Sequence, residues 1–83
     1  MDNERNDIMQ QKQQEIINLT CDLTSAHSTI GDWKLIKQQE AVTLGLPAPY
    51  TDEQMLAYHE QRQAARDRIN ALQAEIAEME AQA

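Results

Sequence analysis

The side chains of this chain that could do chemistry are few and lie far apart in the sequence. His27 and His59 are in different halves, and neither belongs to a His-x-x-x-His or Glu-x-x-His pair that would place two metal ligands on one helix face. Cys21 is the single cysteine, and its position between Leu19 and Leu23 is typical of a structural thiol rather than a nucleophile. We therefore expect no metal site and no cofactor.

Neighbouring carboxylates also lack the surroundings that acid–base catalysis needs. Asp52 and Glu53 are expected at the start of a helix, where both face water. Glu78 and Glu80 are expected in the last turns of a helix, again in contact with water. The sequence contains no glycine-rich phosphate loop and no nucleophile elbow. These observations predict a protein that is not an enzyme and has no small-molecule substrate.

Length and charge narrow the class of protein further. The chain has 83 residues, enough for one small helical domain over residues 1–83. Its net charge of −7 repels nucleic-acid phosphates, so we expect no direct binding to DNA or RNA. No apolar run approaches the roughly 18 residues that a membrane span needs, and the first residues do not resemble a secretion signal. We expect a cytoplasmic protein that does not enter a membrane.

The chain is expected to be all-α, because its composition favours helices and its two proline residues fall in one short break. Gly45 is a typical helix terminator, and Pro47 and Pro49 prevent the helix from continuing. Thr51 and Gln54 form a capping-box pattern, which predicts the start of a second helix. The predicted elements are a helix over about 4–44, a loop over 45–51 and a helix over about 52–80.

A group of polar and flexible residues inside the first predicted helix offers a place for a bend. Gly31 costs about 1 kcal/mol in a helix interior, and Ser28 can cap a new helix that starts near Thr29. The apolar spacing nevertheless continues through Ile30 and Trp33 without a change of phase. We therefore favour one continuous or gently bent helix, with two separate helices as the alternative.

Apolar residues recur at alternating steps of three and four along both predicted helices, which is the spacing of a coiled coil. A connection of about six residues is too short for a parallel return, so the helices should form an antiparallel hairpin. The predicted seam comprises Ile16, Leu19, Leu23, Ala26 and Ile30 in the first helix and Ala65, Ile69, Leu72, Ile76 and Met79 in the second.

Pairing about the proline-containing loop predicts which residues face each other. It places Ile16 opposite Met79 and Leu23 opposite Leu72. A helix rises 1.5 Å per residue, so the longer first helix, at about 60 Å, should extend beyond the end of the second, at about 45 Å. The predicted overhang contains Ile8, Met9 and Lys12.

Arg62 is the one charged residue at a seam position. The predicted register brings it opposite Trp33, on whose indole the guanidinium can stack. Asp32 and Glu60 are the candidate ionic partners.

So small a hairpin buries little apolar surface, and small domains commonly gain stability by association. A second apolar face lies off the seam and comprises Ile17, Leu35, Ile36, Val42 and Leu56. We therefore expect self-association into a dimer or a larger helical bundle.

Two polar stretches are more characteristic of a particular group of proteins than the apolar spacing, which many helical proteins share. The first is Ser28-x-Ile30-Gly31-Asp32-Trp33-Lys34, followed by Lys37-x-x-Glu40, Leu46-Pro47 and Pro49-Tyr50. The second is Arg62-Gln63-x-x-Arg66-Asp67-x-Ile69-Asn70-x-Leu72. Together they resemble a pattern in short uncharacterised helical proteins encoded by bacteriophage and prophage genomes, often among virion or tail genes. The resemblance covers residues 28–73.

This resemblance implies a viral origin and a role in the structure or assembly of the particle. The protein would then be made in the bacterial cytoplasm, with incorporation into the virion as a further step, and would bind its own copies and other phage or host proteins. The resemblance also implies one interaction or structural cluster, made of Asp32, Trp33, Lys34, Arg62, Arg66 and Asp67. Two alternatives stay open: an acidic inhibitor of a host defence or regulatory protein, and an adaptor that offers its seam to a partner coiled coil.

Overall fold

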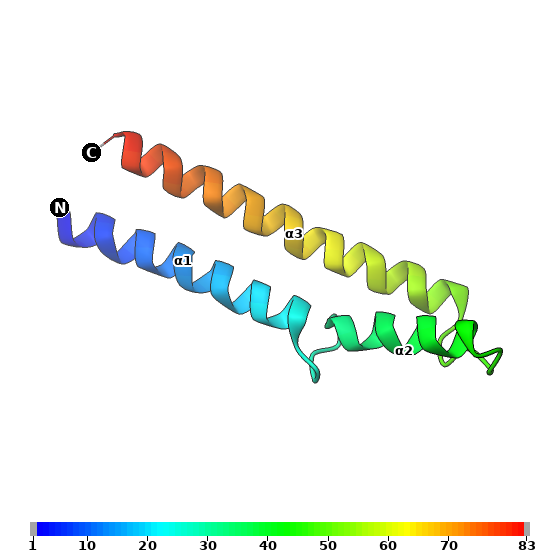
Figure 1. Cartoon of the computed structure of the whole chain (residues 1–83). Coiled ribbons are helices and arrows are strands. Elements are labelled where there is room, and N and C mark those ends of the chain that lie inside the picture. Colours follow the sequence, from blue (N-terminus) through cyan, green and yellow to red (C-terminus); the bar gives the residue numbers. More distant parts are fainter. Residues whose placement is uncertain (1, 83) are drawn as a thin grey trace.

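The computed structural model describes residues 2–82 and contains three α-helices in this range. Their bounds are Asp2–Thr24 for α1, Asp32–Thr43 for α2 and Asp52–Ala81 for α3. α1 and α3 lie side by side in opposite directions, so the two ends of the chain meet at one end of an elongated molecule (Figure 1). The predicted all-α fold and its antiparallel helical hairpin are therefore confirmed.

A loop at residues 25–31 interrupts the first predicted helix, so the prediction of one continuous helix is wrong. Two serine side chains take up the backbone donors of this loop. The Ser25 hydroxyl oxygen accepts hydrogen bonds from the N–H groups of His27 and Ser28, at 2.9 and 3.1 Å. The Ser28 hydroxyl oxygen accepts one from the N–H of Ile30 at 3.1 Å. Such short polar side chains compete with the helical pattern for backbone donors, and here they end it.

The new helix begins later than the predicted cap at Ser28. α2 starts at Asp32, and the residue before it, Gly31, has extended dihedral angles and provides no side-chain cap. Asp32 instead places a negative charge in the first turn, where the helix dipole stabilises it.

The second break follows the sequence prediction at both of its ends. Gly45 has a φ of 70°, and the N–H of Leu46 donates to the carbonyl of Ala41 at 2.9 Å, as in a Schellman motif. At the start of α3, the N–H of Gln54 donates to the Thr51 hydroxyl oxygen, and the N–H of Thr51 donates to the Gln54 side chain. The predicted capping box is therefore confirmed.

The loop at 25–31 shifts the register of α1 along α3. The backbone carbonyl of Leu23, which was predicted to lie opposite Leu72, accepts a hydrogen bond from Arg62 instead. Arg62 lies ten residues nearer to the turn of the hairpin. The predicted register is wrong because a compact loop replaces seven residues that would advance a helix by about 10 Å.

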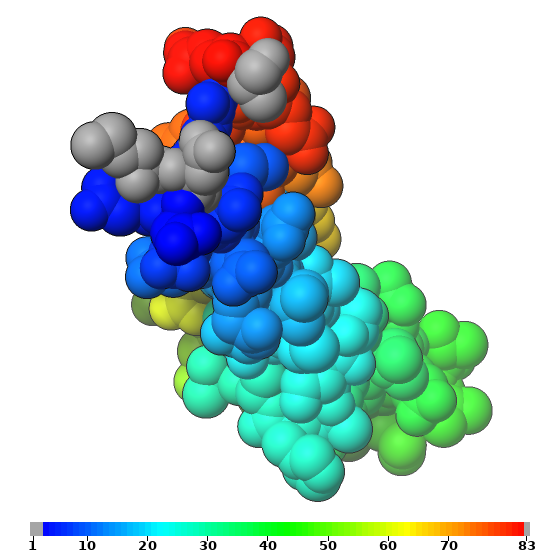
Figure 2. All heavy atoms as spheres, turned by 90° about the vertical axis from the view of Figure 1, so that its left-hand side faces the viewer, coloured from blue at the N-terminus to red at the C-terminus, as the bar shows by residue number. Residues whose placement is uncertain are grey.

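The open ends of α1 and α3 match, so the predicted overhang is also wrong. The Arg5 guanidinium donates to the carbonyl of Met79, which was predicted to lie opposite Ile16. The Lys12 ammonium, placed by the prediction beyond the second helix, pairs with the Glu75 carboxylate at 2.8 Å. Figure 2 looks at this end of the molecule, where the blue start of α1 lies against the red end of α3.

The face that each helix turns to its neighbour is the face that the apolar spacing predicts. Leu72 is fully buried, and Leu23, Tyr58 and Ala65 are buried with it. The remaining predicted seam residues in α1, the loop and α3 are half-buried: Ile16, Leu19, Ile30, Ile69, Ile76 and Met79. Ala26 is different, because it lies exposed in the loop, so its predicted place in the seam is wrong.

Two ion pairs tie the exposed edges of α1 and α3 together. The Arg68 guanidinium donates to both carboxylate oxygens of Glu15 at 3.1 Å, and these hydrogen bonds raise the pKa of Arg68. The hydrogen bond from Lys12, followed by its charge, lowers the pKa of Glu75. Pairs as exposed as these contribute little to stability but favour one register.

The lowered pKa of Glu75 predicts an acid-dependent contribution to stability. Folding lowers the pKa of Glu75 from its ordinary value near 4.5. The ionised carboxylate therefore stabilises the folded state at pH values above that ordinary value, and this contribution is lost as the pH falls through the lowered pKa. Glu75→Gln should therefore melt below the parent protein at about pH 7, and the difference should vanish near pH 2. Thermal melts over this range check it; a difference that does not change with pH would contradict it.

Candidate functional site

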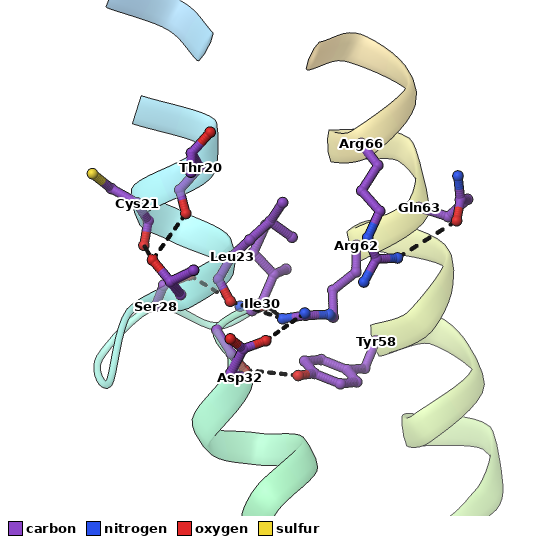
Figure 3. Close-up of polar contacts among 12 residues, drawn as sticks. Thr20, Cys21, Leu23, Ser28, Ile30, Asp32, Tyr58, Arg62, Gln63 and Arg66 are labelled. Atoms are coloured by element: carbon purple, nitrogen blue, oxygen red, sulfur yellow. Dashed lines mark hydrogen bonds and ion pairs between the residues drawn. The ribbon is translucent and has the colours of Figure 1, made fainter. Parts of the chain in front are cut away.

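The one buried charged side chain among the described residues is that of Arg62, on α3. Arg62 is 6% exposed and points at the break between α1 and α2 (Figure 3). Its Nη1 donates to the backbone carbonyls of Leu23 at 2.9 Å and Ile30 at 2.7 Å. Its Nη2 donates to Oδ1 of Asp32 at 2.5 Å, which makes an ion pair.

Tyr58 supports this arginine from one turn earlier in α3. Its hydroxyl donates to the carbonyl of Gly31 at 2.7 Å, and its ring centroid lies 5.4 Å from Cζ of Arg62. A cation over an aromatic face is favourable, and it is more so when water is excluded. Tyr58 and Arg62 therefore bind three successive parts of one loop: the carbonyls of Ile30 and Gly31 and the carboxylate of Asp32.

The arrangement fixes two helix ends with one side chain. Leu23 carries one of the last carbonyls of α1, which have no partner within the helix and form the negative end of its dipole. The guanidinium satisfies that carbonyl and at the same time neutralises Asp32 at the start of α2. No buried side-chain nitrogen or oxygen in the described residues lacks a hydrogen-bond partner. The site thus acts as a structural fastener, which we call the arginine clamp (Arg62, Tyr58, Asp32).

Trp33 does not stack on Arg62, so that prediction is wrong. The ring beside the guanidinium is that of Tyr58, which precedes Arg62 by one turn of α3. The indole N–H of Trp33 donates instead to the carbonyl of Ser28 at 2.7 Å and closes the loop from the side of α2. Of the two candidate ionic partners of Arg62, Asp32 is the one found, while Glu60 is exposed on α3.

The structure brings together only part of the predicted cluster. Lys34 lies over the rings of Trp33 and Tyr50, beside the clamp rather than in it. Arg66 and Asp67 are exposed on α3, where both contact the side chain of Gln63, at 3.5 and 2.9 Å. Among the described residues, neither of the two makes a hydrogen bond or an ion pair with Asp32 or Arg62.

Sequence reasoning missed two residues that build the site. For Tyr58 the one signal was its position four residues before Arg62, from which its hydroxyl and the guanidinium can reach the same part of the chain. For Ser25 the signal was its spacing to Ser28, whose N–H donates to the Ser25 hydroxyl oxygen and closes the loop.

Gly31 is needed because the loop folds closely on itself. A Cβ atom at this position would lie 2.1 Å from the carbonyl oxygen of Ser25 and 3.0 Å from the Trp33 ring. Gly31→Ala should destabilise the fold by about 1–3 kcal/mol, as overpacking typically does. It should also change the near-ultraviolet circular dichroism of Trp33, the only tryptophan.

Gly45→Ala is the matched control for that substitution. Gly45 has a positive φ, but no atom lies within 4 Å of a Cβ added there. The control should cost about 1 kcal/mol and leave the Trp33 signal unchanged. An unchanged Trp33 signal in Gly31→Ala would contradict the packing of the loop.

Other kinds of site find little support in the described part of the chain. Between residues 2 and 82 there is no group of three or more His, Cys, Asp and Glu side chains placed to hold a metal ion. Cys21 is a free, exposed thiol. Within the same range, no helix combines the length and the apolar character needed to cross a bilayer.

Comparison of the chain with models of protein families, with curated proteins and with solved structures finds no match. The class of protein is therefore defined by the fold and site alone: an antiparallel helical hairpin whose first arm is broken once and fastened by a buried arginine.

Proposed function

We propose that this chain is a non-enzymatic helical protein that associates with copies of itself, as a structural or assembly component of a bacteriophage or prophage particle. The observation that carries the proposal is an apolar surface at the turn of the hairpin. Ile36, Leu44 and Leu46 are 54%, 70% and 58% exposed. Exposed apolar side chains that adjoin one another mark association surfaces more often than isolated ones do.

These side chains form one surface rather than scattered positions. Ile36 and Leu44 line one shallow hollow, and Leu44 and Leu46 line a second, with Glu40 shared by both. We call this surface the turn-end patch (Ile36, Glu40, Leu44, Leu46). A second copy of the chain is the occupant we favour, because a core of this size commonly needs oligomerisation for stability.

The viral part of the proposal is supported by the resemblance of residues 28–73 to phage and prophage proteins. The two stretches that carry this resemblance meet at the arginine clamp, where Arg62 of the second binds Ile30 and Asp32 of the first. A pattern whose distant halves contact each other is what a shared fold would maintain.

Sedimentation velocity at micromolar concentration tests self-association. The parent protein should sediment as a dimer or larger species, and Leu44→Glu should shift it toward the monomer without loss of helicity. Ile8→Glu is the matched control, since Ile8 is 46% exposed on α1 and lines neither hollow. A parent protein that stays a folded monomer would contradict the proposal.

Mass spectrometry of purified particles tests the viral role. The protein should be recovered from virions of the phage that encodes it, or from assembly intermediates of those particles. Its absence from both would leave self-association standing but would overturn the role in the particle.

A further inference from the structure

A second polar feature lies beside the arginine clamp and shares only Tyr58 with it. It is a hollow of about 260 Å³ between the loop at 25–31, the first turn of α2 and the first turns of α3. The side chains that line it include Thr29, Lys34, Tyr50, Met55, Tyr58 and Gln61. Ligand sites typically measure about 300–1,000 Å³, so this hollow suits a small molecule rather than a large cofactor.

Lys34 is the charged group of the hollow. Of the other half-buried or buried cations, Lys12 and Arg62 each pair with a carboxylate, and Arg5 donates to the backbone carbonyl of Met79. The Lys34 ammonium has no carboxylate within ion-pair distance in the described residues and lies 5.6 Å from the ring centroid of Trp33 and 5.7 Å from that of Tyr50. Aromatic faces offset only part of the cost of withdrawing a cation from water. An anion bound at this point would supply the negative charge that the described residues do not place near the Lys34 ammonium.

The rest of the lining favours an anion that carries an apolar body. No aspartate or glutamate lines the hollow, although acidic residues outnumber basic ones by fourteen to seven in the whole chain. Met55 and the ring of Tyr58 provide apolar surface, and Thr29 and Gln61 add hydrogen-bonding groups at the edge. A neutral apolar ligand would leave Lys34 unpaired, and an inorganic anion would leave the apolar wall in contact with water.

We propose that this hollow binds a small organic acid with a flat apolar body. Its carboxylate accepts a charge-assisted hydrogen bond from the Lys34 ammonium, and its body packs against Tyr58 and Met55. The site is independent of the turn-end patch and of the proposed function. Because Tyr58 also holds the carbonyl of Gly31, a bound acid would rest directly on the loop that the clamp closes.

Titration of the ¹⁵N-labelled protein with benzoate, followed by NMR, tests the proposal. Benzoate should shift the amide signals of Lys34, Tyr50 and Met55 and saturate at millimolar concentration. Benzamide, which has the same shape but no charge, should bind at least about tenfold more weakly, as expected for the loss of one charge-assisted hydrogen bond.

Two lysine variants provide the matched comparison. Lys34→Met should weaken benzoate binding at least about tenfold, whereas Lys37→Met, on the next turn of α2 and outside the hollow, should not change it. Equal binding of benzoate and benzamide by the parent protein would overturn the proposal without any variant. So would shifts confined to other residues, no saturation below about 10 mM, or unchanged affinity in a folded Lys34→Met protein.

Discussion

Arg62→Ala is expected to lower the free energy of unfolding by about 2–4 kcal/mol, because it leaves two enclosed backbone carbonyls without the charged donor that binds them. The substitution removes three hydrogen bonds at once. It leaves the carbonyls of Leu23 and Ile30 without their donor in a part of the molecule from which water is largely excluded. Because small domains are stable by only about 5–15 kcal/mol, this loss is a large share of the total. Urea denaturation followed by circular dichroism measures it.

Arg66→Ala is the matched control. Arg66 lies one turn farther along the same helix, is exposed, and makes one hydrogen bond among the described residues, to Gln63. Removing it should change the free energy of unfolding by less than about 0.5 kcal/mol. Equal effects of the two substitutions would show that Arg62 does not fasten the break.

Arg62→Lys separates the geometry of the clamp from its charge. The lysine ammonium keeps the positive charge but lacks the planar fork that reaches two carbonyls and a carboxylate together. We expect it to recover only part of the stability lost in Arg62→Ala. Full recovery would mean that charge alone accounts for the clamp.

Leu72→Ala carries the second large effect, a loss of about 3–4 kcal/mol. Leu72 has no exposed surface and lies where α3 packs on α1. Truncation removes its apolar burial and leaves a cavity that two rigid helices can close only in part. Leu56→Ala is the control, because Leu56 is 60% exposed on the same helix. A loss below about 1 kcal/mol at Leu72 would contradict the packing of the seam.

The features that were predictable from the sequence depend on residues close together in the chain. The capping box at Thr51 and Gln54 and the helix end at Gly45 each rest on hydrogen bonds across a few residues. The faces of the helices follow from the three-and-four spacing, which is a property of one helix at a time. Such features need no knowledge of what packs against them.

The break at 25–31 and the register were not predictable in the same way, because distant residues decide them. The continuing apolar spacing through Ile30 favoured an unbroken helix, and the local signals from Ser25 and Ser28 were too weak to outweigh it. What satisfies the carbonyl of Leu23 is Arg62, 39 residues later. Once the loop forms, every contact between α1 and α3 moves toward the turn of the hairpin. The predicted residue pairs are therefore all wrong for the same reason, whereas the predicted buried faces of the two helices are unchanged.

The register of α1 against α3 depends on both the break and the clamp, and spin-label distance measurements test it directly. In a Cys21→Ser background, one label at Asn18 is combined with a second at either Ala64 or Ala77, all of them exposed positions. Dilution with unlabelled protein removes distances between molecules. The two α3 positions are thirteen residues, or about 20 Å, apart along the helix.

The structure predicts that Asn18 lies nearer to Ala64, because the neighbouring pair of Glu15 and Arg68 is in contact. An unbroken first helix would instead place Asn18 opposite Ala77. A shorter distance to Ala64 than to Ala77 is the result we predict, and the reverse order would contradict both the break and the clamp.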